Sequence, residues 1–314
     1  MDINHIYNSE CLIGLKSIPD NSIHCCVTSP PYYKLRDYGH KDQIGIEKTP
    51  EEYIQKLVDV FREVKRVMKD DGTLWINIGD SYNGSGKAGS NPNYWGKHTA
   101  FGKLANKSTF GYPVKVASCK PKDLIGIPWM LAFALRADGW YLRQDIIWNK
   151  PSVMPESVRD RCTKSHEYIF LLSKNKRYYF DSGSIAEPAT SFDTIVRNRD
   201  TTKLNNTPGR AKMKGLVRND YLKRNKRSVW IVNTQPSKEA HFAVFPEKLI
   251  IDCIKAGCPE GGVVIDPFMG SGTTAVVARK LNRNYIGFEL NPEFISIANR
   301  RLDKELGMFK YDQK

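Results

Sequence analysis

Long hydrophobic runs are missing from this 314-residue sequence. The longest apolar stretch, around residues 125–135, contains a glycine and a proline and is too short to cross a bilayer. The first residues also lack a basic region followed by an apolar core, which is the pattern of a secretory signal. We therefore expect a cytoplasmic protein with no membrane partner.

Paired cysteines are missing as well. The seven cysteines are odd in number, and none forms a Cys-x-x-Cys pair. This usage is typical of reduced thiols in a cytoplasm and not of a disulfide framework. The sequence also shows no spacing of metal-ligating side chains, so we expect no metal site.

Basic residues, by contrast, are in excess. The formal net charge is +14 and the isoelectric point is about 9.3. A surplus of this size favours a polyanionic partner. The hydrophobic content of 40% and charged content of 26% are typical of a globular chain. The length predicts one large domain with an insertion, or two domains.

Strand and helix patterns alternate along most of the chain. The clearest helix starts after Thr49, which can form a capping box with Glu52, and it is expected to end at Asp71-Gly72. Residues 6–27 predict a strand, a short helix and a second strand. Further strands are predicted at 73–78, 141–148, 167–172, 177–180, 229–232, 263–266 and 285–289, and helices at 128–137, 246–256, 273–281 and after 291. This alternation predicts an α/β fold with a mainly parallel sheet.

Two long segments interrupt the alternation. Residues 81–122 are rich in Gly, Ser, Asn and Lys, and a loop of this length is usually functional or mobile. Residues 181–228 lose hydrophobic periodicity and gather basic side chains. A charge run is often a solvated insertion, but in a basic protein it is also the electrostatic signature of nucleic-acid binding. The candidate residues are Arg197, Arg199, Arg210, Lys212, Lys214, Arg218, Arg224 and Arg227.

A rigid segment, Thr28-Ser29-Pro30-Pro31-Tyr32, follows the predicted strand at 23–27. Its two prolines lack amide hydrogens and fix their own φ angles, so neither a helix nor a strand ladder continues there. The strand therefore ends abruptly and displays a hydroxyl, a carbonyl and an aromatic ring. Taken alone, the segment also fits an ordinary turn at a strand end.

A glycine-rich turn, Asp266-Pro267-Phe268-Met269-Gly270-Ser271-Gly272-Thr273, lies between a strand and a helix near the other end of the chain. Its glycines let a ligand approach the backbone at the carboxyl edge of the sheet. Glu289 ends the next strand, where an acidic side chain can bind ribose hydroxyls. The pattern indicates a nucleoside-containing cofactor such as NAD. However, the third dinucleotide glycine is missing, and Asp266 favours a cationic amino-acid tail over a pyrophosphate.

The segment at 28–32 and the turn at 266–273 together resemble the amino-methylating DNA methyltransferases. Members of that family use S-adenosylmethionine (AdoMet) and modify N4 of cytosine or N6 of adenine. The catalytic motif comes first and the cofactor motif last, which resembles their permuted beta group. The likeness extends over about 6–180 and 229–305. It leaves out 181–228, where that group keeps its target-recognition region.

The resemblance implies the Rossmann-like fold of AdoMet-dependent methyltransferases. This fold has a seven-stranded, mostly parallel sheet with one antiparallel strand and helices on both faces. Residues 1–180 and 229–314 would form one composite catalytic and AdoMet-binding domain. Within it, 81–122 would be a long DNA-facing loop, and 181–228 would be the target-recognition region. The source would be prokaryotic, archaeal or a phage.

The resemblance also implies roles for the residues of the two motifs. Those expected to bind AdoMet are Asp266, Phe268, Gly270, Ser271, Gly272 and Thr273, with Glu289 on the ribose and Phe245-Pro246 around the methionine part. The catalytic segment is Ser29, Pro30, Pro31 and Tyr32. Ser29 and the Pro30 carbonyl can accept hydrogen bonds from the target amino group, and Tyr32, or Tyr33, can stack on an extruded base.

Ser29 bears on which base is modified. In the family, Ser-Pro-Pro-Tyr resembles the cytosine-N4 enzymes, and Asp-Pro-Pro-Tyr is commoner among adenine-N6 enzymes. The prediction is therefore a site-specific cytosine-N4 DNA methyltransferase acting on duplex DNA, with adenine N6 as the alternative. Asp80 could assist with the amino proton or simply cap a turn.

Other functions remain open from the sequence. The chain could be a non-catalytic DNA-binding protein on the same scaffold, or could methylate RNA or protein. The sequence also leaves open its recognition site, whether it forms a homodimer, and whether a cognate restriction endonuclease acts beside it.

Overall fold

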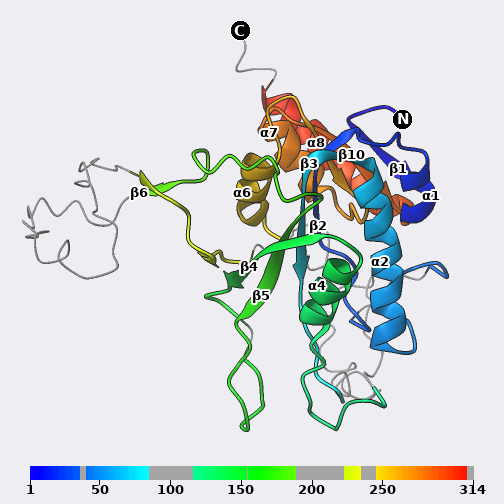
Figure 1. Cartoon of the computed structure of the whole chain (residues 1–314), viewed down its shortest axis with the longest axis vertical. Helices are drawn as coiled ribbons and strands as arrows, with labels where there is room; N and C mark the ends of the chain where they lie inside the picture. The colour runs from blue at the N-terminus through cyan, green and yellow to red at the C-terminus, as the bar shows by residue number, and fades with distance from the viewer. Residues whose placement is uncertain (36–39, 85–115, 154, 189–222, 235–244, 310–314) are drawn as a thin grey trace, which may run out of the picture.

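The structure is a computed structural model and describes residues 1–35, 40–84, 116–153, 155–188, 223–234 and 245–309 (Figure 1). In this part of the chain, no helix combines the length and apolarity that a membrane span requires. Residues 85–115 of the predicted DNA-facing loop and 189–222 of the predicted target-recognition region lie outside the described residues.

One sheet forms the centre of the molecule, with the strand order β1-β10-β9-β2-β3-β5-β4-β8. The strands are β1 His5–Asn8, β2 Ile23–Thr28, β3 Met68–Ile78, β4 Tyr141–Asn149, β5 His166–Ser173, β8 Val229–Ile231, β9 Val263–Asp266 and β10 Asn284–Glu289. All described pairings in this sheet are parallel except those of β5 with β3 and with β4. The antiparallel strand is therefore confirmed. The count of seven is wrong by one, because the short β8 adds an eighth strand beside β4.

Helices cover both faces of the sheet, as predicted (Figure 1). They are α1 Cys11–Lys16, α2 Pro50–Val67, α4 Ile127–Ala137, α6 Glu247–Gly257, α7 Thr273–Lys280 and α8 Pro292–Phe309. The first three pack in one hydrophobic core and the last three in another. Side chains alternate along β2, so Cys26 belongs to the first core, and Cys25 and Val27 belong to the second.

The capping box at the start of α2 is confirmed. The Thr49 hydroxyl accepts the Glu52 amide at 3.2 Å, and the Glu52 carboxylate accepts the Thr49 amide at 3.4 Å. The predicted end at Asp71-Gly72 is wrong. The helix stops at Val67, because Met68 already has extended backbone angles and is paired with Ile23 of β2.

The strand predicted at 177–180 is also wrong. The backbone amide of Tyr179 donates to the carbonyl of Asp71, in the irregular part of β3, and the amide of Asp181 donates to Ala256 at the end of α6. These hydrogen bonds anchor residues 177–181 to a strand and to a helix end, but residues 177–180 form no strand. Phe180 still packs, with its ring stacked 6.3 Å from that of Trp75.

The two ends of the chain meet in the sheet. Strands β9 and β10, from the C-terminal part, lie between β1 and β2, from the N-terminal part. A separate two-stranded ladder, β6 Glu187–Pro188 with β7 Lys223–Arg224, flanks the segment 189–222. The parallel arrangement brings the carboxyl ends of β1, β2, β3, β9 and β10 to the same edge, where ligand sites of α/β sheets form.

Candidate active site

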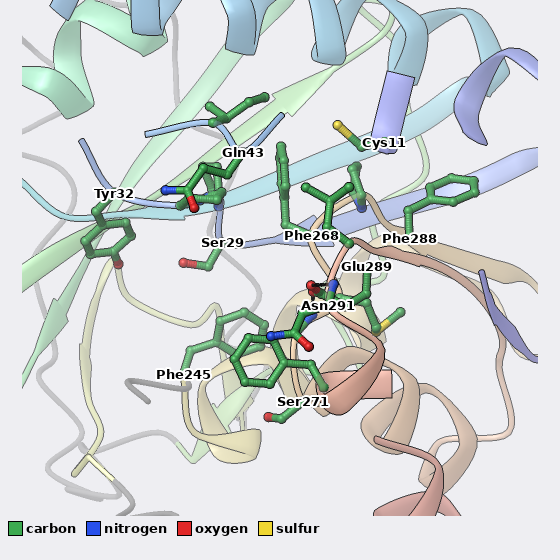
Figure 2. Close-up of a pocket in the computed structure, with 18 of the residues that line it drawn as sticks. Cys11, Ser29, Tyr32, Gln43, Phe245, Phe268, Ser271, Phe288, Glu289 and Asn291 are labelled. Atoms are coloured by element: carbon green, nitrogen blue, oxygen red, sulfur yellow. Dashed lines mark hydrogen bonds between the residues drawn. The ribbon is translucent and has the colours of Figure 1, made fainter. Parts of the chain in front are cut away.

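A cavity of about 290 Å³ lies at that edge. Its lining includes Ser29, Pro30, Pro31 and Tyr32 after β2, the turn residues Pro267–Ser271 and Thr273 after β9, and Glu289 at the end of β10. Figure 2 shows Ser29 between Tyr32 on one side and Phe268 on the other. The two motifs singled out in the sequence therefore share one cavity.

The segment after β2 is held from behind by the start of α2. The hydroxyl of Tyr53 donates to the carbonyl of Pro31 at 2.7 Å. Tyr33 is 1% exposed, and its hydroxyl donates to the carbonyl of Lys48 at 3.1 Å. Tyr33 therefore belongs to the core and does not offer a face to a base, which corrects the alternative that gave it a stacking role.

Tyr32, unlike Tyr33, lines the cavity. Its hydroxyl donates to the Glu167 carboxylate at 2.7 Å and also lies 3.2 Å from the side-chain oxygen of Asn77. Burial, followed by the charge of Glu167, raises the pKa of Tyr32 well above its ordinary value. The Tyr32 side chain therefore keeps its proton and stays neutral, and its hydroxyl acts as a hydrogen-bond donor to Glu167.

Asp266 joins the two motifs from beneath the cavity. Its carboxylate accepts the hydroxyls of Thr28 at 2.6 Å and Thr274 at 2.7 Å, and the amide of Phe268 at 3.0 Å. Burial raises its pKa to about 6, against the opposing effect of these hydrogen bonds. Asp266 is 1% exposed and is not among the lining residues. In this position Asp266 fixes the turn, and its direct contact with the cofactor stays a prediction.

Two glycines of the turn have left-handed backbone angles, with φ of +53° at Gly270 and +82° at Gly272. A side chain at Gly272 would place its Cβ 2.6 Å from the Cβ of Ala298 in α8. Gly272 thus allows α7 and α8 to approach closely, and it does not line the cavity. Gly270 does line it, with its amide donating to Glu289 at 2.8 Å.

Glu289 is positioned by backbone amides. One carboxylate oxygen accepts the amide of Gly270, and the other accepts the amide of Asn291 at 2.9 Å. Burial raises the pKa of Glu289, and these two hydrogen bonds oppose that shift. Asn291 in turn caps α8, because its side chain accepts the amide of Glu293 at 2.8 Å.

Arg301 of α8 supports the turn from outside. Its guanidinium donates to the Ser271 carbonyl at 2.7 Å and to the Thr273 hydroxyl at 3.1 Å, and it lies 3.4 Å from Glu247 at the start of α6. Phe245, just before α6, lines the cavity, whereas Pro246 does not and serves as the N-terminal cap residue of α6.

Several lining residues escaped the sequence analysis. Ser9, Glu10 and Cys11 follow β1, which lies next to β10 in the sheet, so they share the edge with Glu289. Their position directly after a strand was the available signal. Asn77 at the end of β3, Lys150 after β4 and Glu167 in β5 complete the side of the cavity around Tyr32.

Asp80 follows β3 as predicted, and its carboxylate binds three backbone amides. The donors are Ser81 at 2.9 Å, Gly126 at 3.0 Å and Ile127 at 3.1 Å. These contacts favour the turn-capping interpretation, since they fix the loop to the start of α4. Cys25 and Cys26 of β2 are core residues, and burial raises the pKa of both thiols well above the ordinary value.

Two of the predicted DNA-binding residues are described. Arg224 and Arg227 each lie 3.4 Å from the same carboxylate oxygen of Glu187, across the β6–β7 ladder. Arg227 is the more exposed of the two, at 69% against 29%. The other six candidates, between 197 and 218, lie outside the described residues.

Comparison with known proteins decides the family. The model of the N6/N4 methyltransferase family, described as DNA methylase, matches residues 23–300, a range that contains both motifs. The chain belongs to this family. It is a DNA methyltransferase, and its cofactor is AdoMet.

Similar proteins cover nearly the whole chain. Type II methyltransferase M.SmaI of Serratia marcescens is 50% identical over 289 residues, which are 92% of this chain and 87% of that protein. Type II methyltransferase M.Cfr9I of Citrobacter freundii is 44% identical over 300 residues, covering 96% and 88%.

Solved structures agree on the fold of AdoMet methyltransferases. The cytosine-N4-specific PvuII DNA methyltransferase superposes with a TM-score of 0.62 at 18% identity, covering 98% of this chain and 91% of that one. A putative DNA modification methylase from Thermus thermophilus, complexed with AdoMet, gives 0.57 at 22% identity, covering 96% and 95%.

Proposed function

We propose that this enzyme transfers the methyl group of AdoMet to the exocyclic N4 of a cytosine extruded from duplex DNA. The observation that carries the proposal is Ser29, a neutral hydroxyl where the adenine-N6 enzymes commonly have aspartate, in the same cavity as the glycine turn. The cytosine-N4 specificity in the printed name of the PvuII enzyme supports it. So do the Type II methyltransferases among the relatives, which also favour site-specific methylation within a restriction–modification system.

The cavity fits AdoMet by its chemistry. The Glu289 carboxylate, held by two amides, faces the cavity as an acceptor for ribose hydroxyls. The methionine part would lie along Phe268, Gly270, Ser271 and Thr273, with Phe245 closing that side (Figure 2). Asp266 contributes by holding the turn in shape, through Phe268 and Thr274.

The target amino group needs activation. An exocyclic amine is a poor nucleophile because its lone pair is delocalised into the ring, and the base must first leave the stack at a cost of a few kcal/mol. Ser29 and the carbonyl of Pro30 accept hydrogen bonds from the amine, which draws its lone pair out of conjugation and toward the cofactor. Bound AdoMet supplies an electrophilic methyl group. Tyr32 offers an aromatic surface to the extruded ring.

Duplex DNA would approach this edge of the sheet. The cationic candidates of 181–228, which include Arg224 and Arg227, would bind phosphates and position the duplex. Contacts to base edges would determine which DNA sequence is recognised. A separate restriction endonuclease of the same specificity would act on the unmethylated site.

Product analysis tests the proposal. The enzyme is incubated with methyl-labelled AdoMet and unmethylated plasmid DNA, and the DNA is digested to nucleosides and separated. We expect label in N4-methyl-2′-deoxycytidine. Label in N6-methyl-2′-deoxyadenosine would contradict the cytosine assignment and favour the alternative. Parallel incubations with RNA and with protein should remain unlabelled, and label there with none in DNA would contradict the DNA substrate.

A further inference from the structure

Glu167 reaches the site because its strand runs the other way. Strand β5 is antiparallel to β3, so its first residues lie at the edge where the parallel strands end. His166 and Glu167 therefore stand beside the last residues of β3 and β4. The Glu167 side chain is 17% exposed and lines the cavity.

The Glu167 carboxylate is the centre of a polar cluster around Tyr32. One oxygen accepts the Tyr32 hydroxyl at 2.7 Å and the Asn77 side-chain amide at 3.3 Å. The other is ion-paired with Lys150, whose ammonium also lies 4.1 Å from the centroid of the Trp148 ring. A hydrogen bond from a hydroxyl to a paired, partly buried carboxylate is stronger than one between neutral groups.

One edge of the Tyr32 ring lies against Gly79. A Cβ at Gly79 would lie 2.6 Å from Cε2 and 3.2 Å from Cδ2 of Tyr32. Because residue 79 is a glycine, the Tyr32 ring can occupy the space that a side chain at this position would fill. The hydroxyl is held at one end by Glu167, the ring edge lies against the backbone, and Asn77 donates to both Glu167 and the carbonyl of Tyr168. Together these contacts restrict the rotation of the ring.

We propose that Glu167 is a positioning residue for methyl transfer. It fixes the orientation of Tyr32, and thereby the aromatic wall against which the extruded base is placed beside Ser29. This inference rests on the proposed function, because it requires Tyr32 to face the target base. The ion pair with Lys150 orients the Glu167 carboxylate. A correctly placed base raises the transfer rate, since small displacements from the reactive geometry are costly.

A double-mutant cycle tests whether Glu167 acts through Tyr32. Tyr32→Phe, Glu167→Gln and the double variant are compared with the wild type in single-turnover methyl transfer to unmethylated plasmid DNA. We expect each single variant to be about 10- to 100-fold slower, the range that corresponds to loss of a hydrogen bond to a charged group. The double variant should be no slower than the slower single one, and AdoMet affinity by calorimetry should be unchanged.

Two results would overturn the inference: a wild-type rate in Glu167→Gln, or single effects that multiply in the double variant. Thermal unfolding shows whether each variant is folded. Gly79→Ala provides a second route that keeps the Glu167 carboxylate. The added Cβ would lie 2.6 Å from the Tyr32 ring, so the ring must shift, whereas its 3.4 Å distance to Glu167 Cδ is an ordinary contact. That variant should also be slow with AdoMet affinity retained, and a wild-type rate would contradict the inference even if Glu167→Gln did not fold.

The inference and the proposed function fail differently. If the wild type labels no nucleoside in DNA, or Ser29→Ala transfers at the wild-type rate, the proposed function fails. If Ser29→Ala is slow while Glu167→Gln and Gly79→Ala match the wild type, Ser29 keeps its role and the positioning role of Glu167 alone is rejected.

Discussion

Thr28 and Asp266 are 238 positions apart in the sequence and are joined by a buried hydrogen bond of 2.6 Å. Thr28 directly precedes Ser29, and Asp266 begins the glycine turn. The Asp266 carboxylate therefore connects the catalytic and cofactor motifs, although Asp266 does not line the cavity.

Thr28→Val should weaken both stability and cofactor binding. The substitution keeps the side-chain shape and removes the hydroxyl, so the buried Asp266 carboxylate loses a donor. We expect a loss of about 1–3 kcal/mol in the free energy of unfolding, measured by chemical denaturation, together with weaker AdoMet binding. Thr28→Ser, which retains the hydroxyl, is the matched control and should bind AdoMet much more like the wild type. Equal AdoMet affinity in Thr28→Val and the wild type would contradict the link between the motifs.

Asp266→Asn should change how stability depends on pH. Burial raises the pKa of Asp266 from 3.8 to about 6. Between these two pH values the folded state holds a proton on Asp266 that the unfolded state has released. The contribution of Asp266 to the free energy of unfolding therefore falls as the pH rises from about 4 to about 6. Relative to Asp266→Asn, the wild type should lose about 3 kcal/mol of stability across that window and no more above it. Parallel curves for the two proteins, from denaturation at a series of pH values, would refute the raised pKa.

Glu289→Gln should weaken AdoMet binding about 10- to 100-fold, because a charged acceptor for the ribose hydroxyls becomes neutral. Burial raises the pKa of Glu289, so wild-type affinity should fall on acidification at a higher pH than an ordinary glutamate would give. The variant should lack this dependence. Calorimetric titration across pH 4–8 checks both effects. Glu293→Gln, exposed in the first turn of α8, is the control and should behave as the wild type.

Arg227→Ala should reduce the salt dependence of DNA binding. If the exposed Arg227 guanidinium contacts one phosphate, the negative slope of log K against log salt should become shallower by about 0.9. Arg224→Ala should have a smaller effect on DNA binding, since its side chain is less exposed beside Glu187. Lys16→Ala, an exposed cation of α1, is the charge-matched control. A slope in Arg227→Ala equal to that of Lys16→Ala would place the DNA elsewhere.

Patterns among residues close in sequence predicted individual helices and strands correctly. The Thr49–Glu52 capping box and the strand 263–266 both have clear signals in the residues that form them, and both are confirmed. The end of α2 was misplaced, because pairing between Met68 and Ile23 overrides the helical pattern.

The candidate site was only partly predictable. Ser29, Tyr32, Gly270 and Glu289 lie on the cavity because each follows or ends a parallel strand, which a sequence pattern can reveal. Glu167 could not be identified in this way, since its place depends on the reversed direction of β5. Asp266 was found at the correct position, but its burial depends on a partner 238 residues away.

The most direct measurement is single-turnover methyl transfer by Ser29→Ala, with AdoMet affinity determined on the same preparation. In the proposed function, Ser29 activates a cytosine amine beside the bound cofactor. We expect the wild type to form N4-methyl-2′-deoxycytidine and the variant to be slower by about 10²–10³-fold, with AdoMet affinity unchanged. A variant that forms the same product at the wild-type rate would contradict the account.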